Sequence, residues 1–198
     1  MVTDKVTGIA GRDLELESGS DRIRLLDALF FSEDAAGTDD MQFPLDRVKV
    51  GANVKPDFDE TNLGLLFPQN DATEKAMLIG QMSHDWLEGD ELHPHIHWQQ
   101  AANTPVVWKL DYQWYNPGEA IPNWVTLVSN GTAFPWAGSK LAQISTFPPI
   151  DGTGKKISSL LKIRLYRDDN TTTGDVLADQ FDCHFRRGSI GSRQEWIK

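Results

Sequence analysis

Three of the five histidines in the chain, His93, His95 and His97, stand at alternate positions of the segment 92–98. In an extended strand, side chains at alternate positions share one face. The spacing therefore predicts a strand that carries three imidazoles on one side and turns Ile96 and Trp98 towards the core. The imidazole face could meet solvent, a partner subunit or a cavity.

Two imidazoles on one strand, His95 and His97, could ligate zinc or iron, with a third ligand from His93 or His184. A catalytic metal site also needs a carboxylate or a third histidine and an open position. A structural metal on an oligomer axis is a second alternative, and histidines without any metal are the third. We favour the third, and so predict no metal, no cofactor and no catalytic residue.

Other residues with chemical potential are predicted to be structural. Cys183 is the only cysteine, so no internal disulfide can form, and its strand-like surroundings predict a buried side chain. Segment 151–156 has glycines and lysines without the spacing of a phosphate-binding loop. Ser139, Ser145 and Ser158 stand in no Gly-x-Ser-x-Gly motif. Together these observations favour a protein that is not an enzyme.

Charge and composition restrict the classes of molecule that the protein is expected to bind. The chain has 198 residues, a formal net charge of -10 and a pI near 4.8, which disfavours contact with nucleic acid. A small basic cluster of Arg186, Arg187 and Arg193 is expected to be solvated or paired. No apolar run is long enough to span a bilayer, and the N-terminus shows no secretory signal. We therefore expect synthesis in a cytoplasm and no membrane partner.

The pattern of breakers and alternation predicts an all-β fold. The 16 glycines and 10 prolines are spread through the chain, which favours short strands. Residues 1–40 are predicted to be an N-terminal arm or short helix (23–31) with a linker, and residues 41–198 an antiparallel β-sandwich of jelly-roll type. Because Pro94 cannot donate to a ladder, the histidine strand is expected at an edge or at a bulge. Strands are expected near residues 48–50, 63–67, 75–82, 92–98, 106–115, 124–128, 142–147, 161–166 and 180–185.

The histidine strand resembles the first half of the cupin metal motif, in which five residues separate a glycine from a following His-x-His pair. Gly89, His95 and His97 match this pattern, but the glutamate expected shortly afterwards is absent from residues 98–102. The resemblance implies a cupin-like metal-binding enzyme that uses His95 and His97, as an alternative function. A carbohydrate-binding module is a further alternative, because Trp86 and Trp124, with Trp136, stand near predicted loops and could stack on sugar rings.

A second resemblance covers residues 40–198. The runs 72–74, 88–89 and 94–98, the alternating residues 110, 112 and 114, and the segments 152–155, 157–159, 167–168, 173–175 and 191–195 are similar to small virion proteins of tailed bacteriophages. The resemblance implies a structural virion protein located in the particle. Capsid decoration or cement is the first expectation, and a neck, tail or fibre component is the second. Its implied partners are copies of itself, as a trimer or ring, and other virion proteins such as the major capsid protein.

Overall fold

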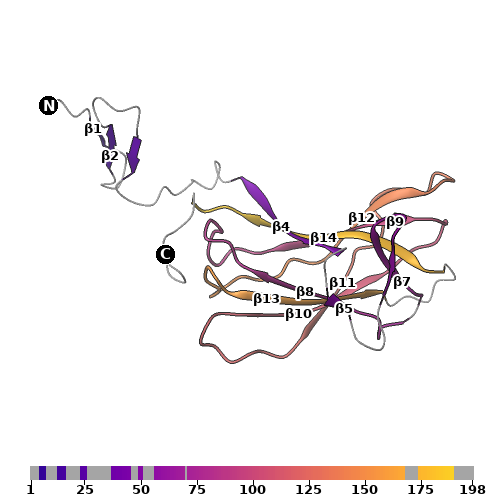
Figure 1. Ribbon diagram of the computed structural model, residues 1–198. Helices are drawn as coiled ribbons and strands as arrows, with labels where there is room; N and C mark the ends of the chain where they lie inside the picture. Colours follow the sequence, from indigo (N-terminus) through magenta and orange to yellow (C-terminus); the bar gives the residue numbers. More distant parts are fainter. Residues whose placement is uncertain are drawn as a thin grey trace.

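The fold is described from a computed structural model. It covers residues 37–45, 56–69, 71–167 and 174–189, and the backbone of 5–7, 13–16, 23–25 and 49–50. These residues form strands and connections, and no α-helix occurs among them. Two antiparallel sheets lie face to face as the two layers of a sandwich (Figure 1), which confirms the all-β prediction.

Each layer contains strands from distant parts of the chain. We call the first layer the β9 sheet and the second the β10 sheet. The β9 sheet has the order β12-β9-β14-β7-β6, with β4 also paired to β14, and the β10 sheet has the order β11-β10-β13-β8-β5. The bounds are β4 Thr38–Pro44, β5 Lys49–Val50, β6 Asp57–Asp59, β7 Gly64–Phe67, β8 Ala76–Gln81, β9 His93–Gln100, β10 Trp108–Tyr115, β11 Val125–Val128, β12 Leu141–Thr146, β13 Leu160–Arg167 and β14 Val176–Arg186.

The pairing of these strands is that of a jelly roll. Leaving aside the short strands β5, β6 and β7, the first of eight strands pairs with the last, β4 with β14. The second pairs with the seventh, β8 with β13, and the third with the sixth, β9 with β12. The two middle strands, β10 and β11, form the innermost hairpin. Rolling this nested hairpin brings β9 beside β14 and β10 beside β13, as the structure has them.

The space between the sheets is filled by aromatic and aliphatic side chains. Trp98 packs edge-on against Trp108, which also contacts Phe67, with ring centroids 6.2 and 5.3 Å apart. Trp86 lies 5.3 Å from Trp114 by the same measure. Alternation on β10 turns its tryptophans inwards as predicted, and burial of these large side chains contributes to the hydrophobic stabilisation.

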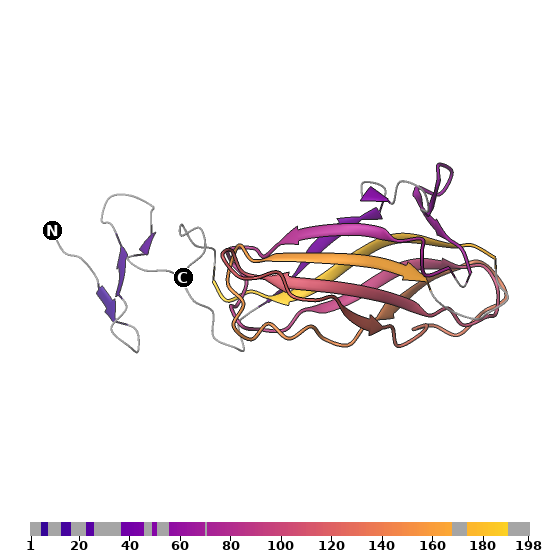
Figure 2. The same ribbon diagram turned by 90° about the horizontal axis from the view of Figure 1, so that it is seen from below.

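The N-terminal expectations have a mixed outcome. Strands β1 (Lys5–Thr7), β2 (Asp13–Leu16) and β3 (Ile23–Leu25) pair with one another in a small antiparallel sheet. The predicted helix over 23–31 is therefore wrong for residues 23–25, which are extended and hydrogen-bonded to β2. Its remaining residues lie outside the described residues, as do residues 32–36 of the predicted linker 32–40. The linker prediction is wrong for residues 38–40, which are extended and pair with β14, so the sandwich begins at Thr38, where β4 starts. Figure 2 shows the long strands of the sandwich from below.

The position predicted for the histidine strand is wrong. β9 lies inside its sheet, between β12 and β14, and the ladder with β14 has no bulge at Pro94. Pro94 is tolerated because it stands at the beginning of β9, opposite the point where β12 ends at Thr146. Its carbonyl still accepts a hydrogen bond from the Phe147 N–H at 3.0 Å, so the ring removes only one terminal donor from the ladder.

Candidate functional site

The histidine row lies on the outer face of the β9 sheet. Ile96 and Trp98 are fully buried between the sheets, as the alternation predicts. The imidazoles point the other way, yet they differ in exposure: the side chain of His95 is only 5% exposed, whereas those of His93 and His97 are about half exposed. The middle imidazole, His95, is therefore the buried member of the row.

A bulge in β14 brings two further ligand-type residues to this face. Ala178 pairs with Trp98 but Gln180 pairs with His97, so Asp179 is an extra residue in the ladder. A slip of one residue exchanges the two faces of a strand. After the bulge, Asp182 stands opposite His95 and His184 opposite His93, and both polar side chains point outwards.

His95 and Asp182 form the buried centre of the cluster. His95 Nε2 is in contact with Asp182 Oδ1, and both side chains are 5% exposed. Apart from this contact, the buried Asp182 Oδ1 has no partner among the described residues. The only donor to the other oxygen is Gln180 Nε2, at 3.3 Å, among the hydrogen bonds of the described residues. The carboxylate is thus removed from water without a full set of donors.

The rim is formed by His184 and His97. The ring centroid of His184 lies 4.4 Å from that of His95, and that of His97 lies 5.1 Å away. His184 Nε2 is 3.0 Å from Asp40 Oδ1 on β4, while His97 Nε2 is 3.7 Å from Asp182 Oδ2. His95, Asp182 and His184 each offer one ligand atom, and these atoms all lie within 4.8 Å of one another.

The electrostatics of the buried centre favour a charged pair when no ion is bound. Burial by itself lowers the pKa of His95, but contact with Asp182 and its negative charge outweigh burial, so the pKa of His95 is raised. The buried imidazole therefore retains a proton to a higher pH than an exposed histidine does.

This cluster differs from the metal-site alternative that the sequence leaves open. That alternative pairs His95 with His97, and the structure instead groups His95 with Asp182 and His184, of which His184 is one of the two possible third ligands. His93 is turned to Glu91, 3.2 Å away, and is not in the group. Asp182 was not identified, because alternation alone places it on an exposed face. The available signal was the change of apolar parity between Ala178 and Phe181, which indicates a bulge.

The other chemical candidates of the sequence lie in structural roles. Cys183 is fully buried, and burial raises the pKa of its thiol, so it is a poor nucleophile. Arg186 makes a two-pronged ion pair with Asp90, with both distances 3.0 Å. Arg187 Nε lies 2.7 Å from Asp85 Oδ2, and Arg193 lies outside the described residues. The loop 151–156 connects β12 to β13, and its lysines pair with nearby glutamates, as expected of a plain loop.

A serine–histidine contact was not anticipated. His84 Nε2 lies 3.0 Å from Ser158 Oγ, and Ser158 has a positive φ of 61° without being a glycine. Left-handed backbone at a non-glycine residue is uncommon and costs free energy. The turn is nevertheless tied to the sandwich, because the Ser158 N–H donates to the carbonyl of Met82 at 3.1 Å. This anchoring accounts for the strained residue as part of the connection into β13.

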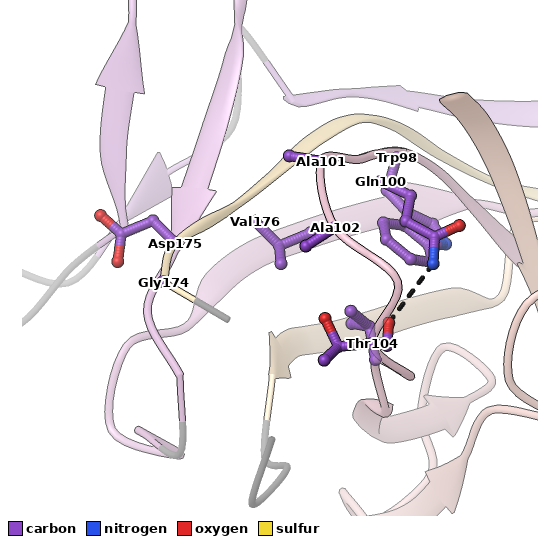
Figure 3. A pocket seen from close by; sticks show the side chains of 9 residues that line it. Trp98, Gln100, Ala101, Ala102, Thr104, Gly174, Asp175 and Val176 are labelled. Carbon is purple, nitrogen blue, oxygen red and sulfur yellow. Dashed lines mark hydrogen bonds between the residues drawn. The ribbon is translucent and has the colours of Figure 1, made fainter. Parts of the chain in front are cut away.

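A pocket of about 360 Å³ lies at one end of the sandwich, between the loop after β9 and the start of β14 (Figure 3). Trp98 and Val176 line its floor, Asp175 stands at the margin, and Gln100 donates to the carbonyl of Thr104 at 3.4 Å. Its wall is mostly apolar and contains no cluster of titratable side chains among the described residues. None of the predicted site residues lines this pocket.

The tryptophans proposed for sugar stacking do not form a common platform. Trp86 is fully buried in the core, so its predicted role is wrong. Trp124 is partly covered by the guanidinium of Arg164, whose Cζ lies 3.7 Å from the ring centroid. Trp136 is half-buried in the loop before β12. Each indole thus has a different environment.

The outer face of the β10 sheet holds a second buried carboxylate, Asp111. Its Oδ2 accepts from Lys75 Nζ at 2.8 Å, and its Oδ1 accepts from the hydroxyls of Thr126 and Tyr166 at 2.8 and 3.1 Å. Burial raises the pKa of Asp111, but these donors, Lys75 first, outweigh burial and lower the pKa overall. Asp111 is therefore a satisfied structural carboxylate.

Comparison with known proteins identified no relative of this chain. No family model, no curated protein and no solved structure matches the chain. Within the described residues, none of the secondary structure is a helix with the length and apolarity needed to cross a bilayer.

Proposed function

We propose that this protein is a structural component of a tailed-bacteriophage virion, which acts by assembling with copies of itself and with other virion proteins. Capsid decoration or cement is the first role, and a neck, tail or fibre position is the second. The jelly-roll fold agrees with the resemblance of residues 40–198 to such proteins. The observation that carries the proposal is the open, uncharged edge strand β11.

β11 pairs with β10 on one side only, among the described strands. Its residues Val125 and Val128 are 46% and 44% exposed, and Ile121 just before it is 58% exposed. The segment 125–128 contains no charged residue. An exposed β-prone edge of this kind is a template for pairing with another chain, and soluble proteins usually block it with charge, proline or a covering segment.

Two other edges of the sandwich, at β12 and β6, are protected. The segment after β11 crosses to the other sheet and covers the edge of β12: Asn130 donates to the Thr146 carbonyl at 2.8 Å, and Ala133 to that of Ile144 at 3.1 Å. The edge strand β6 carries two aspartates in three residues. Because protection is missing at β11, a second copy of the chain is the occupant that we assign to it, and repeated pairing would build a trimer or ring.

Light scattering after size exclusion tests the assembly. We expect an oligomer whose population rises with concentration, and expect Val125→Lys with Val128→Lys to convert it to a monomer. Ile79→Lys is the matched control, because Ile79 is 66% exposed on β8, at a distance from this edge in the sheet order. A monomer at all concentrations, or equal loss of assembly in the control, would contradict edge pairing.

Mass spectrometry of purified particles tests the location. We expect the protein among the virion proteins, in a copy number that is a multiple of its oligomeric state. Its absence from particles that contain the major capsid protein would overturn the virion assignment, whatever its oligomeric state in solution.

A further inference from the structure

We propose that His95, Asp182 and His184 form a binding site for one divalent transition-metal ion of the zinc class on the outer face of the β9 sheet. The site is distinct from the β11 edge, and the inference does not depend on the proposed function.

The donor set determines the class of ion. Two imidazole nitrogens and one carboxylate oxygen are ligands that suit zinc and the neighbouring first-row divalent ions. Calcium and magnesium prefer sites built wholly from oxygen atoms. A site of this composition should therefore discriminate strongly against the latter two ions.

The geometry requires only small side-chain movements. The three ligand atoms already lie within 4.8 Å of one another. Bonds of about 2.0 to 2.1 Å in a tetrahedral zinc site place ligand atoms about 3.3 Å apart. His95 and Asp182 are held by packing on two paired strands, whereas His184 is 47% exposed and can rotate to close the site.

The floor of the site contains a buried carboxylate with few partners. Asp182 Oδ1 is buried and touches His95 Nε2, and this oxygen has no other partner among the described residues. A cation bound between this oxygen and the two imidazoles would add a partner to a buried carboxylate that has few. The burial of both His95 and Asp182 separates the cluster from an ordinary group of surface histidines and aspartates.

The surroundings resemble those of metal ligands in two further respects. Asp40 lies 3.0 Å from His184 Nε2, so a carboxylate already orients this ring, as is usual for ligating imidazoles. His97 is half exposed, with its Nε2 3.7 Å from Asp182 Oδ2, and can supply a fourth ligand in place of water. The ion would enter directly from solvent on this side.

Binding would cross-link two strands of the sheet. His95 belongs to β9, whereas Asp182 and His184 belong to β14. An ion that binds the folded protein and not the unfolded chain raises the unfolding temperature. The metal would therefore fasten the last strand of the jelly roll to the strand beside it.

Titration calorimetry with zinc chloride on the full, tag-free, chelator-treated chain tests the site. We expect one ion per chain, an increase in the unfolding temperature, and no binding of calcium or magnesium at the same concentrations. Cobalt loading should give the visible absorption of a low-coordinate site with nitrogen and oxygen ligands. Absence of zinc binding, or several weak sites per chain without a stabilising effect, would overturn the proposal.

Variants identify the ligands. His184→Ala and Asp182→Asn should each weaken zinc binding by at least about 100-fold. His184 is half exposed, so this substitution leaves the core intact even if the buried Asp182 variant folds poorly. His93→Ala is the matched control, from the same row but turned to Glu91, and should bind as the unmodified chain does. Unchanged affinity in His184→Ala, or equal loss in the His93 control, would sink the assignment.

Discussion

The two outer faces of the sandwich each carry one buried carboxylate, and the two carboxylates are treated in opposite ways. Asp111 on β10 accepts from an ammonium group and two hydroxyls. Asp182 on β14 has a single long hydrogen bond and the close contact of the His95 imidazole. The two carboxylates are buried to a similar extent, so they differ in the number of donors that contact them.

This difference separates a structural role from a binding role. A buried charge with a complete set of partners rigidifies the fold, and it has no capacity left for a ligand. A buried charge with incomplete partners is destabilising alone and becomes favourable only when something else binds. On the β10 face, Asp111 is therefore fully paired with groups of the same chain, whereas on the β9 face Asp182 can still bind an external ion.

Deletion of Asp179 should have the largest effect on this comparison. Without the bulge, Asp182 and His184 would turn into the core, and the alternate residues Phe181, Cys183 and Phe185 would turn out to solvent. We expect a chain that does not fold cooperatively, measured by thermal unfolding followed by circular dichroism. Deletion of Ser139, in an exposed loop before β12, is the control and should be tolerated. A stable Asp179-deleted protein would show that the bulge does not position the cluster.

Matched substitutions test the two carboxylates directly. Asp111→Asn should destabilise the protein by about 3 kcal/mol, because it leaves Lys75 with no charged partner in a partly buried position. Asp182→Asn, in chelator-treated protein, should cost less than Asp111→Asn, because the imidazole of His95 can lose its proton at pH 7 when its charged partner is removed, whereas the ammonium group of Lys75 keeps its charge. The measurement is urea unfolding at pH 7. Equal losses would mean that Asp182 is as well satisfied as Asp111.

Part of the loss of folding stability at low pH should come from protonation of Asp111. The pKa of its carboxyl is lowered in the folded state, so its stabilising contribution is present above its unfolded pKa, about 3.9, and disappears as pH falls through the folded pKa. The difference in unfolding free energy between the unmodified chain and Asp111→Asn should therefore be constant from pH 7 to 5 and shrink below about pH 4. A difference that persists at pH 2 would contradict this origin.

Removal of single donors should have the smallest effect. Thr126→Val deletes one hydroxyl to Asp111 and should cost about 1 kcal/mol. Gln180→Met deletes the long hydrogen bond to Asp182 and should cost less than about 0.5 kcal/mol. Urea unfolding of the two single variants measures both. A larger cost for Gln180→Met would reverse the ranking of the two faces.

The strands and their facing were predictable where alternation is regular. On β10 up to Trp114 and on β9 up to Gln99, apolar and polar residues alternate, so both the strand and its buried side follow from the residues. The jelly-roll type was also anticipated, although the order of strands depends on pairings between distant segments that no local pattern contains. Segment 23–25 shows the opposite case, since apolar spacing compatible with a helix was overridden by pairing with β2.

The candidate site was only half predictable. His95 and the orientation of its ring followed from the spacing, and His184 was a named third ligand. Asp182 was missed because its burial depends on the neighbouring imidazoles and its position depends on a bulge. The missing N–H of Pro94 predicts an edge position, because the sequence does not show where β12 ends. In both cases the decisive information lay on a strand distant in sequence.

The first strand of the jelly roll completes its pairing only with the last one. β4 and β14 are separated by nearly the whole sandwich in sequence. During synthesis, β9 emerges long before β14, so one side of β9 stays without its neighbour until the C-terminal strand has left the ribosome. Contacts of this range make closure slow and leave an intermediate that is prone to aggregate. We therefore expect truncations that remove β14 to yield insoluble protein rather than a smaller folded unit.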